Sequence, residues 1–231
     1  MTNMSARLST RTAAAVTLLT TGALVGASSA LASDIIYETN DPFGGFIGLN
    51  GFDVSEIQSV GVRFTPTADY TLNQVSMWFM NNDTSGTGNG FVTLTLRNDA
   101  ESKSGGSIPG ELIYETWEFQ ISSIGWDPVL ESVTSVEQPM LEAGVNYWVV
   151  AVSDAPTMLN PVWCIAANDN GFATSTTFGR GAWQDGGFGA VPCTIVEGNA
   201  QIREFSLSIS NGLKAGQDAT FAVSGALPSK T

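Results

Sequence analysis

Short segments with alternating apolar and polar residues follow one another along most of the chain. In residues 91–97, Val92, Leu94 and Leu96 share one parity and the polar residues occupy the other. Successive side chains of a strand point to opposite faces, so this pattern predicts strands with one buried face. No run with a helical period is longer than about two turns. The pattern predicts an all-β protein, an antiparallel β-sandwich or jelly-roll-like single domain.

Turn residues set the expected limits of the strands. Asn, Asp, Gly and Pro cluster between the apolar segments, for example at 81–90 and at 168–171, and both of these segments are predicted to be loops or turns. From 171 to 192 the chain is rich in Gly and Thr, with Phe178, Trp183 and Phe188 spaced along it. We expect strands at residues 34–37, 58–65, 70–80, 91–97, 111–121, 130–136, 145–152, 158–167 and 202–209.

The segment 141–152 is expected to form the centre of the fold. Its strand is apolar on both parities and follows Gly144, which can take the positive φ that a tight turn requires. Tyr147 and Trp148 are adjacent, so they are predicted to pack the two opposite faces of this strand as structural core residues. A ligand platform on these rings is the alternative.

The first 32 residues have the layout of a cleaved secretory signal peptide. Arg7 and Arg11 precede a short apolar run at 13–25, and Ala30 and Ala32 form an A-x-A cleavage pattern. The apolar run is too short to span a membrane as a helix. The sequence therefore predicts a secreted or periplasmic protein, with an uncleaved leader as the alternative.

Three regions of the chain are expected: the signal peptide at 1–32, a β-sandwich domain at 33–210 and a Gly-rich segment at 211–231. The last segment is interpreted as a tail, because so few residues cannot bury a core of their own. The opening strand of an incomplete second β-module is the alternative. No later segment is long and apolar enough to predict a membrane span in the mature chain.

Charge and composition exclude several classes of function. All 22 acidic residues and seven of the nine basic residues follow Ala32, so the mature chain carries a net charge near −15. This charge argues against binding to nucleic acids or to anionic membranes. The chain has no histidine, which removes Ser-His-Asp and Cys-His catalysis and the usual zinc sites.

The two cysteines, Cys164 and Cys193, are 29 positions apart. In a secreted protein this pair predicts a disulfide, which would stabilise the fold by about 3–4 kcal/mol. Two separate buried thiols that pack as small hydrophobic side chains are the alternative.

Two short motifs resemble the choice-of-anchor domains of secreted bacterial proteins, most closely type R. They are Ser-Ile-Pro-Gly-Glu-Leu at 107–112 and Leu-Glu-Ala-Gly-Val-Asn-Tyr-Trp at 141–148, with Gln58 and Phe64 as an early pair. The resemblance covers roughly 57–163 and implies a secreted β-sandwich without known catalytic residues. Such domains usually end in a sorting anchor, which is not evident at the end of this sequence, so we expect a released or periplasmic protein.

Aromatic residues outside the expected strands are the candidates for ligand binding. Trp183 is followed by Gln184 and Asp185, and Trp126 lies in a Gly-Trp-Asp-Pro turn. A flat apolar ring beside planar hydrogen-bonding groups suits a sugar. The alternative is that these rings fold back and cover one end of the sandwich.

Oxygen-bearing loops suggest calcium as a cofactor, if the protein has one. Asp83, Asp99 and Asp169 lie in Asn- and Asp-rich segments whose oxygens could serve as ligands. None of these segments matches a known calcium motif, and the same residues are common in ordinary turns. For catalysis, Glu115 and Glu118 are the least ordinary carboxylates, but their opposite parity places them on opposite faces of a strand.

The sequence therefore predicts a secreted, non-catalytic β-sandwich with a structural or adhesive role at the cell surface or in an extracellular matrix. The alternative is a carbohydrate-binding module that uses loop aromatic residues, with or without calcium. A glycan or a surface protein is the expected partner. The two functions differ in whether Trp126 and Trp183 are buried or exposed beside a polar groove.

Overall fold

The computed structural model describes residues 33–44, 50–84, 90–175, 182–184 and 187–201. These ranges are nearly all antiparallel β-sheet, which confirms the all-β prediction. None of the helices in the described ranges is long and apolar enough to cross a membrane. The expected signal peptide (1–32), the strand at 202–209 and the segment 211–231 lie outside the described residues.

Twelve strands and one short 3₁₀ helix make up the described fold. The elements are β1 (Asp34–Glu38), η1 (Pro42–Gly44), β2 (Gly51–Asp53), β3 (Val60–Phe64), β4 (Tyr70–Asn81), β5 (Phe91–Glu101), β6 (Ser107–Gln120), β7 (Val129–Thr134), β8 (Met140–Leu141), β9 (Tyr147–Val152), β10 (Pro161–Ser175), β11 (Phe188–Pro192) and β12 (Thr194–Ala200).

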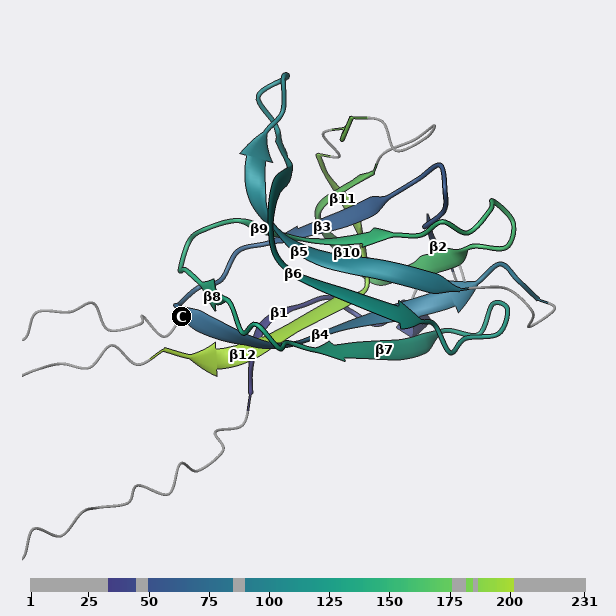
Figure 1. Cartoon of the computed structure of the whole chain (residues 1–231), viewed down its shortest axis with the longest axis horizontal. Helices are drawn as coiled ribbons and strands as arrows, with labels where there is room; N and C mark the ends of the chain where they lie inside the picture. Colours follow the sequence, from purple (N-terminus) through teal and green to yellow (C-terminus); the bar gives the residue numbers. More distant parts are fainter. Residues whose placement is uncertain (1–32, 45–49, 85–89, 176–181, 185–186, 202–231) are drawn as a thin grey trace, which may run out of the picture. The chain divides into compact units, whose positions relative to one another are not determined.

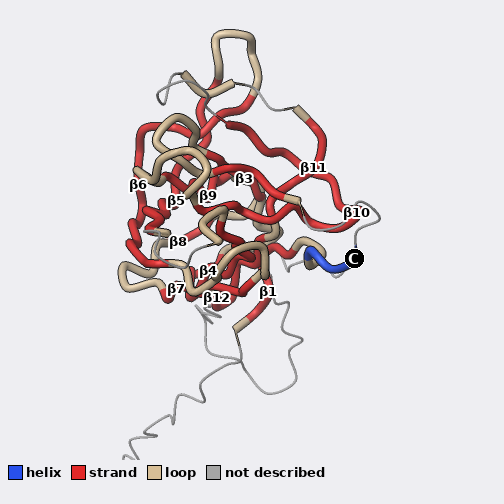
Figure 2. The backbone as a smooth tube through the Cα atoms, turned by 90° about the vertical axis from the view of Figure 1, so that its right-hand side faces the viewer, coloured by secondary structure: helices blue, strands red, loops and turns tan. Residues whose placement is uncertain are grey.

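The strands form two layers (Figures 1 and 2). One layer, the β9 sheet, has the order β11-β10-β3-β9-β5-β6. The other layer, the β4 sheet, pairs β4 with β12 and with the start of β10 on one side and with β7 and β8 on the other; β1 extends it beyond β12. This arrangement is a β-sandwich in which β4 and β9 are central strands.

Strand β10 connects the two layers. Its first residues, 161–163, pair with β4, whereas its last residues, 172–175, pair with β3. The register breaks between Ile165 and Asn170, and Asn168 takes a positive φ of 54°. The prediction of a turn at 168–171 is therefore wrong. These turn-forming residues instead bend a continuous strand from one sheet into the other, as at a β-bulge.

Four described strands lie outside the expected ranges: β2, β8, β11 and β12. β11 falls in the Gly- and Thr-rich segment 171–192, and β12 follows it and lies between β1 and β4. Gly198 explains part of this difference, because a Cβ at this position would lie 2.5 Å from the Thr71 carbonyl oxygen. The glycine therefore allows β12 to approach β4 closely and is not a sign of a turn.

The core lies between the two sheets. β4 contributes Leu72, Val75, Met77 and Phe79, and these side chains are fully buried. The facing side chains from the β9 sheet are equally buried; they include Val60, Val62, Phe64, Val92, Leu94, Leu96, Tyr147, Val149 and Ala151. The alternating residues of 91–97 thus place their apolar parity inward, as predicted.

A buried carboxylate closes one open side of the sandwich. Glu115 of β6 is 5% exposed and accepts hydrogen bonds from the Ser135 hydroxyl at 2.5 Å and the Val136 amide at 2.6 Å. Trp117, two residues along, donates its indole N–H to the Thr134 carbonyl at 2.9 Å. Glu115 therefore ties β6 to the segment after β7, whereas Glu118 is exposed.

Candidate binding sites

The two aromatic residues of the central motif take opposite faces of β9. Gly144 has a φ of +76° in the tight turn before β9, which begins at Tyr147. Tyr147 is 2% exposed and its ring stacks on Phe64 inside the core at a centroid distance of 5.8 Å. Trp148, 1% exposed, lies on the outer face of the β9 sheet. The motif therefore packs both faces of one strand.

Trp148 is buried because a hairpin covers it. β5 and β6 extend beyond the sheet as a bent hairpin, and Pro109 lies over Gly61 beside the Trp148 ring. The Asp99 carboxylate accepts a hydrogen bond from the Trp148 indole N–H at 2.7 Å and another from the Ser107 hydroxyl. These contacts close the outer face at this position, so Trp148 offers no surface to a ligand.

The three aspartates considered as calcium ligands belong to separate elements. Asp99 hydrogen-bonds within the hairpin, Asp83 is 1% exposed in the loop after β4, and Asp169 lies in β10. Within the described ranges, no three carboxylate, thiol or imidazole side chains form a group that could hold a metal ion.

The structure corrects the predicted disulfide, because Cys164 and Cys193 are both free thiols. They lie on neighbouring segments of the core, where the Cys193 amide donates to the Cys164 carbonyl at 2.8 Å. Burial raises the pKa of Cys164 to about 12 and also raises that of Cys193. Both side chains therefore stay protonated and pack as small hydrophobic groups.

The loop aromatics predicted to bind a ligand differ in exposure. Trp126 is 59% exposed in the turn before β7. Trp183 is half-buried and the next residue, Gln184, is exposed, with its amide donating to the Ser175 carbonyl at 3.4 Å. Asp185 lies outside the described residues. Neither tryptophan lines either of the two pockets described below.

A cleft of ≈ 490 Å³ opens on the outer face of the β4 sheet, around Trp78. We call it the Trp78 cleft. Trp78 and its neighbours on β7 and β12 form the apolar part, and the segment after β1 and residue Asp169 of β10 form the polar part. The lining residues are Glu38, Thr39, Asn40, Asp41, Trp78, Leu130, Asp169 and Ile195.

Hydrogen bonds hold the polar wall of the Trp78 cleft in place. The Asn40 amide donates to the Asp169 carboxylate at 3.2 Å, and the Ala167 amide donates to the Asp41 carbonyl at 3.0 Å. The Phe43 amide donates to the Asp41 carboxylate at 2.9 Å, and this turn places the Phe43 ring edge-on to Trp78 at 5.3 Å. The chain after β1 is thus fixed against the bend of β10.

The Trp78 cleft is negatively charged. Glu38, Asp41 and Asp169 line it, and no basic residue does. The negative charge of Asp169 also acts on the neighbouring Tyr37. Burial and, to a smaller extent, this charge raise the pKa of Tyr37 to about 12. Asp41 accepts one backbone amide and Asp169 accepts two, and a carboxylate has about four acceptor positions, so both keep positions for further donors.

Trp78 combines an accessible ring with fixed hydrogen-bond acceptors, the pair of features that a sugar requires. The sequence pattern gives one signal for this site, because Trp78 lies between the core residues Met77 and Phe79 and so points to the opposite face of β4. The cleft walls come from residues 38–41 and from residue 169, and their approach to Trp78 depends on strand pairing that the sequence pattern does not reveal.

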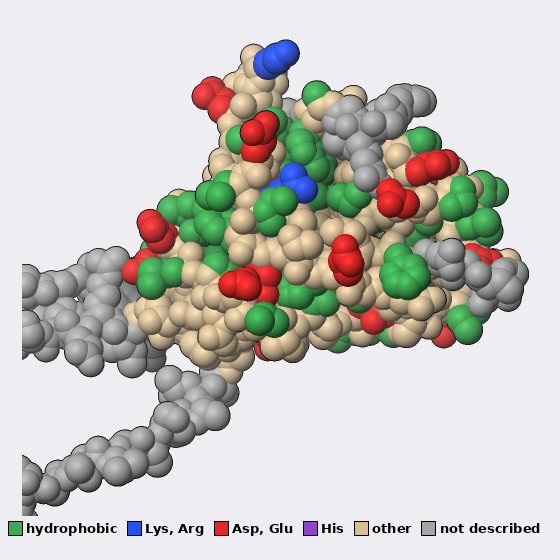
Figure 3. Space-filling model, viewed as in Figure 1, with side chains coloured by type: hydrophobic (Ala, Val, Ile, Leu, Met, Phe, Trp, Pro, Cys, Tyr) green, Lys and Arg blue, Asp and Glu red, His purple; other side chains and the backbone are tan. Residues whose placement is uncertain are grey.

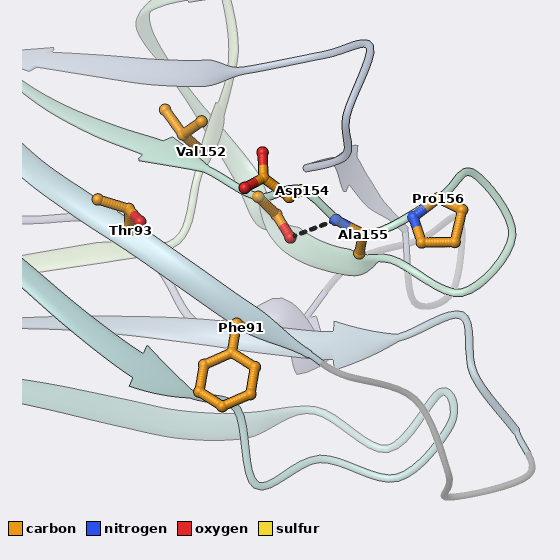
Figure 4. A pocket seen from close by; sticks show the side chains of 7 residues that line it. Phe91, Thr93, Val152, Asp154, Ala155 and Pro156 are labelled. Carbon is orange, nitrogen blue, oxygen red and sulfur yellow. Dashed lines mark hydrogen bonds between the residues drawn. The ribbon is translucent and has the colours of Figure 1, made fainter.

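A second pocket, of ≈ 330 Å³, lies on the outer face of the β9 sheet (Figure 4). Phe91 and Thr93 of β5 line it from one side, and 152–156, the end of β9 and the following turn, from the other. The Ala155 amide donates to the Ser153 hydroxyl at 3.2 Å and shapes this turn. This pocket has one aromatic wall, from Phe91, which is 54% exposed.

The chain matches no model of a known protein family, no curated protein and no solved structure.

Proposed function

We propose that this protein is a secreted, non-catalytic β-sandwich with an adhesive role at the cell surface or in an extracellular matrix, and that it holds a neutral glycan in the Trp78 cleft. The observation that carries the proposal is the half-buried Trp78 ring beside three carboxylates and Asn40 in one cleft. The Trp78 ring packs on the C–H face of a sugar, and the carboxylates accept hydrogen bonds from the hydroxyl groups of the sugar.

The charge of the cleft selects among glycans. Three carboxylates in one cleft repel uronates and sulfated sugars, and the acidic composition of the whole chain adds to this repulsion. Neutral polysaccharides carry hydroxyl groups without this cost. The proposal replaces Trp126 and Trp183 with Trp78 as the ligand platform, because only Trp78 lies in a described pocket.

The test is binding of the protein to a panel of polysaccharides. The panel contains neutral cellulose, xylan and chitin, cationic chitosan and anionic alginate. We expect binding to at least one neutral polymer, lost in Trp78→Ala and weakened severalfold in Glu38→Gln. Trp126→Ala is the matched control, because it removes an exposed ring outside the cleft and is expected to bind as the unmodified protein does.

Other outcomes would contradict the proposal. Binding that survives Trp78→Ala but not Trp126→Ala would move the platform to the turn before β7. Binding to chitosan alone, lost at raised salt concentration, would assign the cleft to organic cations, since a tryptophan ring and carboxylates also suit a positive charge. Absence of binding to every polymer would leave the cleft without a glycan role.

A further inference from the structure

The described part of the chain places its few basic residues on one face. Three basic residues, Arg63, Arg97 and Lys103, accompany nineteen acidic ones in these ranges. Arg63 belongs to β3, Arg97 to β5, and Lys103 to the tip of the β5–β6 hairpin. In Figure 3 the basic side chains visible on this face lie at the hairpin tip and among hydrophobic side chains beside it, while acidic ones are spread widely.

Arg63 is held in place by an aromatic ring. Its guanidinium carbon lies 3.6 Å from the centroid of the Phe172 ring, and Phe172 packs edge-on against Phe188 at 5.8 Å. Strand pairing aligns the three residues, because Phe172 is opposite both Arg63 on β3 and Phe188 on β11. The stacked guanidinium is planar, and its edge keeps several N–H donors directed away from the ring.

No carboxylate of the described ranges forms an ion pair with Arg63, although acidic residues outnumber basic ones about sixfold there. The same is true of Arg97, which is half-buried and donates its Nε–H to the Thr95 hydroxyl at 2.9 Å. In so acidic a domain, a pre-positioned arginine without an acidic partner among the described residues is a complementary site for an anion from another molecule.

The surroundings of Arg63 suit a protein partner. Phe188 is 71% exposed and Phe172 is 37% exposed, and exposed aromatic residues beside arginine are enriched at the centres of protein interfaces. A long polyanion would meet the acidic remainder of the domain and be repelled. A single carboxylate between apolar side chains avoids this repulsion and covers the two rings.

We propose that the surface formed by Arg63, Phe172 and Phe188 binds a protein segment that carries one Asp or Glu next to apolar residues. The carboxylate pairs with the edge of the Arg63 guanidinium, and the apolar neighbours pack on Phe172 and Phe188. This surface lies on the β9 sheet, so its role does not depend on the Trp78 cleft or on a glycan.

The test uses a phage-displayed library of linear 12-residue peptides selected on the whole protein. We expect the enriched peptides to share an acidic residue beside apolar ones. Synthetic versions should bind Arg63→Gln about tenfold or more weakly than the unmodified protein. Lys103→Gln is the matched control, because it removes the same charge at the exposed hairpin tip and should leave affinity unchanged.

Two further variants distinguish the stacked arginine from a general charge effect. Arg63→Lys keeps the charge but loses the planar fork, and Phe172→Leu keeps the apolar side chain but loses the stack, so both should weaken binding. Equal loss in Lys103→Gln, enrichment of peptides without acidic residues, or absence of any enriched peptide would overturn the proposal. Arg63-dependent binding of alginate instead of peptides, or Arg63-dependent self-association, would also overturn it.

Discussion

Two tryptophans lie on the outer faces of the two sheets and differ in how far their rings are exposed to solvent. Trp148, on the β9 sheet, is 1% exposed beneath Pro109, and its indole N–H is bound by Asp99. Trp78, on the β4 sheet, is half-buried in an open cleft. Outward parity on a strand therefore does not by itself make a tryptophan a ligand platform. What decides is whether another part of the chain covers the ring or leaves it open.

The difference also separates two kinds of carboxylate. Asp99 is committed to hydrogen bonds from within its own hairpin and from β9, and these bonds hold the fold together. The carboxylates of Glu38, Asp41 and Asp169 instead line the open Trp78 cleft. We expect substitutions on the Trp148 side to change stability and substitutions on the Trp78 side to change binding.

The largest expected effect is on the free energy of unfolding of Trp148→Ala. Removing a fully buried ring leaves a cavity, which costs about 3–5 kcal/mol. Trp78→Ala, which removes a partly solvated ring, should cost about 1–2 kcal/mol. Urea unfolding followed by circular dichroism measures both values, and equal costs would contradict the distinction between a covered and an open ring.

A smaller effect is expected for Asp99→Ala. The Trp148 indole N–H and the Ser107 hydroxyl lose a charged acceptor, which should reduce the free energy of unfolding by about 1–3 kcal/mol. Glu38→Ala is the control from the Trp78 cleft and should change stability by about 0.5 kcal/mol or less, because Glu38 is exposed. Thermal unfolding of the pair measures the difference, and a larger loss for Glu38→Ala would contradict it.

The sequence pattern predicts what depends on local alternation. The strand at 91–97, the central strand after Gly144 and the all-β class follow from parity and turn residues alone. The turn predicted at 168–171 is wrong, because Asn, Asp and Gly occur in both turns and bulges, and tertiary pairing decides between them. The Trp78 cleft joins residues far apart in sequence, so its polar wall could not be predicted. The covering of Trp148 by Pro109 is likewise a long-range contact.

The region beneath the Trp78 cleft should give a pH-dependent effect. The folded-state pKa of Tyr37 is about 12, against 10.0 for the unperturbed side chain. Above pH 10 the unfolded chain loses this proton before the folded protein does, so stability should fall progressively between pH 10 and pH 12. Tyr37→Phe should reduce this fall, measured as the unfolding midpoint in denaturant at each pH.

The charge of Asp169 can be tested on the same tyrosine. Burial is the larger cause of the raised pKa and Asp169 the smaller one, so Asp169→Asn should lower the pKa of Tyr37 only in part. The tyrosinate absorbance of Asp169→Asn is followed against pH and compared with that of the double variant Asp169→Asn, Tyr37→Phe. The difference between the two curves gives the titration of Tyr37 alone, which is compared with that of the protein that keeps Asp169. An unchanged pKa would show that Asp169 does not face Tyr37 beneath the cleft.

The most direct measurement follows the six indole N–H signals of the protein by NMR while the neutral glycan that binds best is added. Trp148, Trp117 and Trp163 donate their indole N–H groups to acceptors within the fold, so their signals should stay in place and exchange slowly with solvent. The signal of Trp78 should shift with added glycan, and that of Trp126 should not. A shift of Trp126 or Trp183 with Trp78 unmoved would contradict the Trp78 cleft as the ligand site.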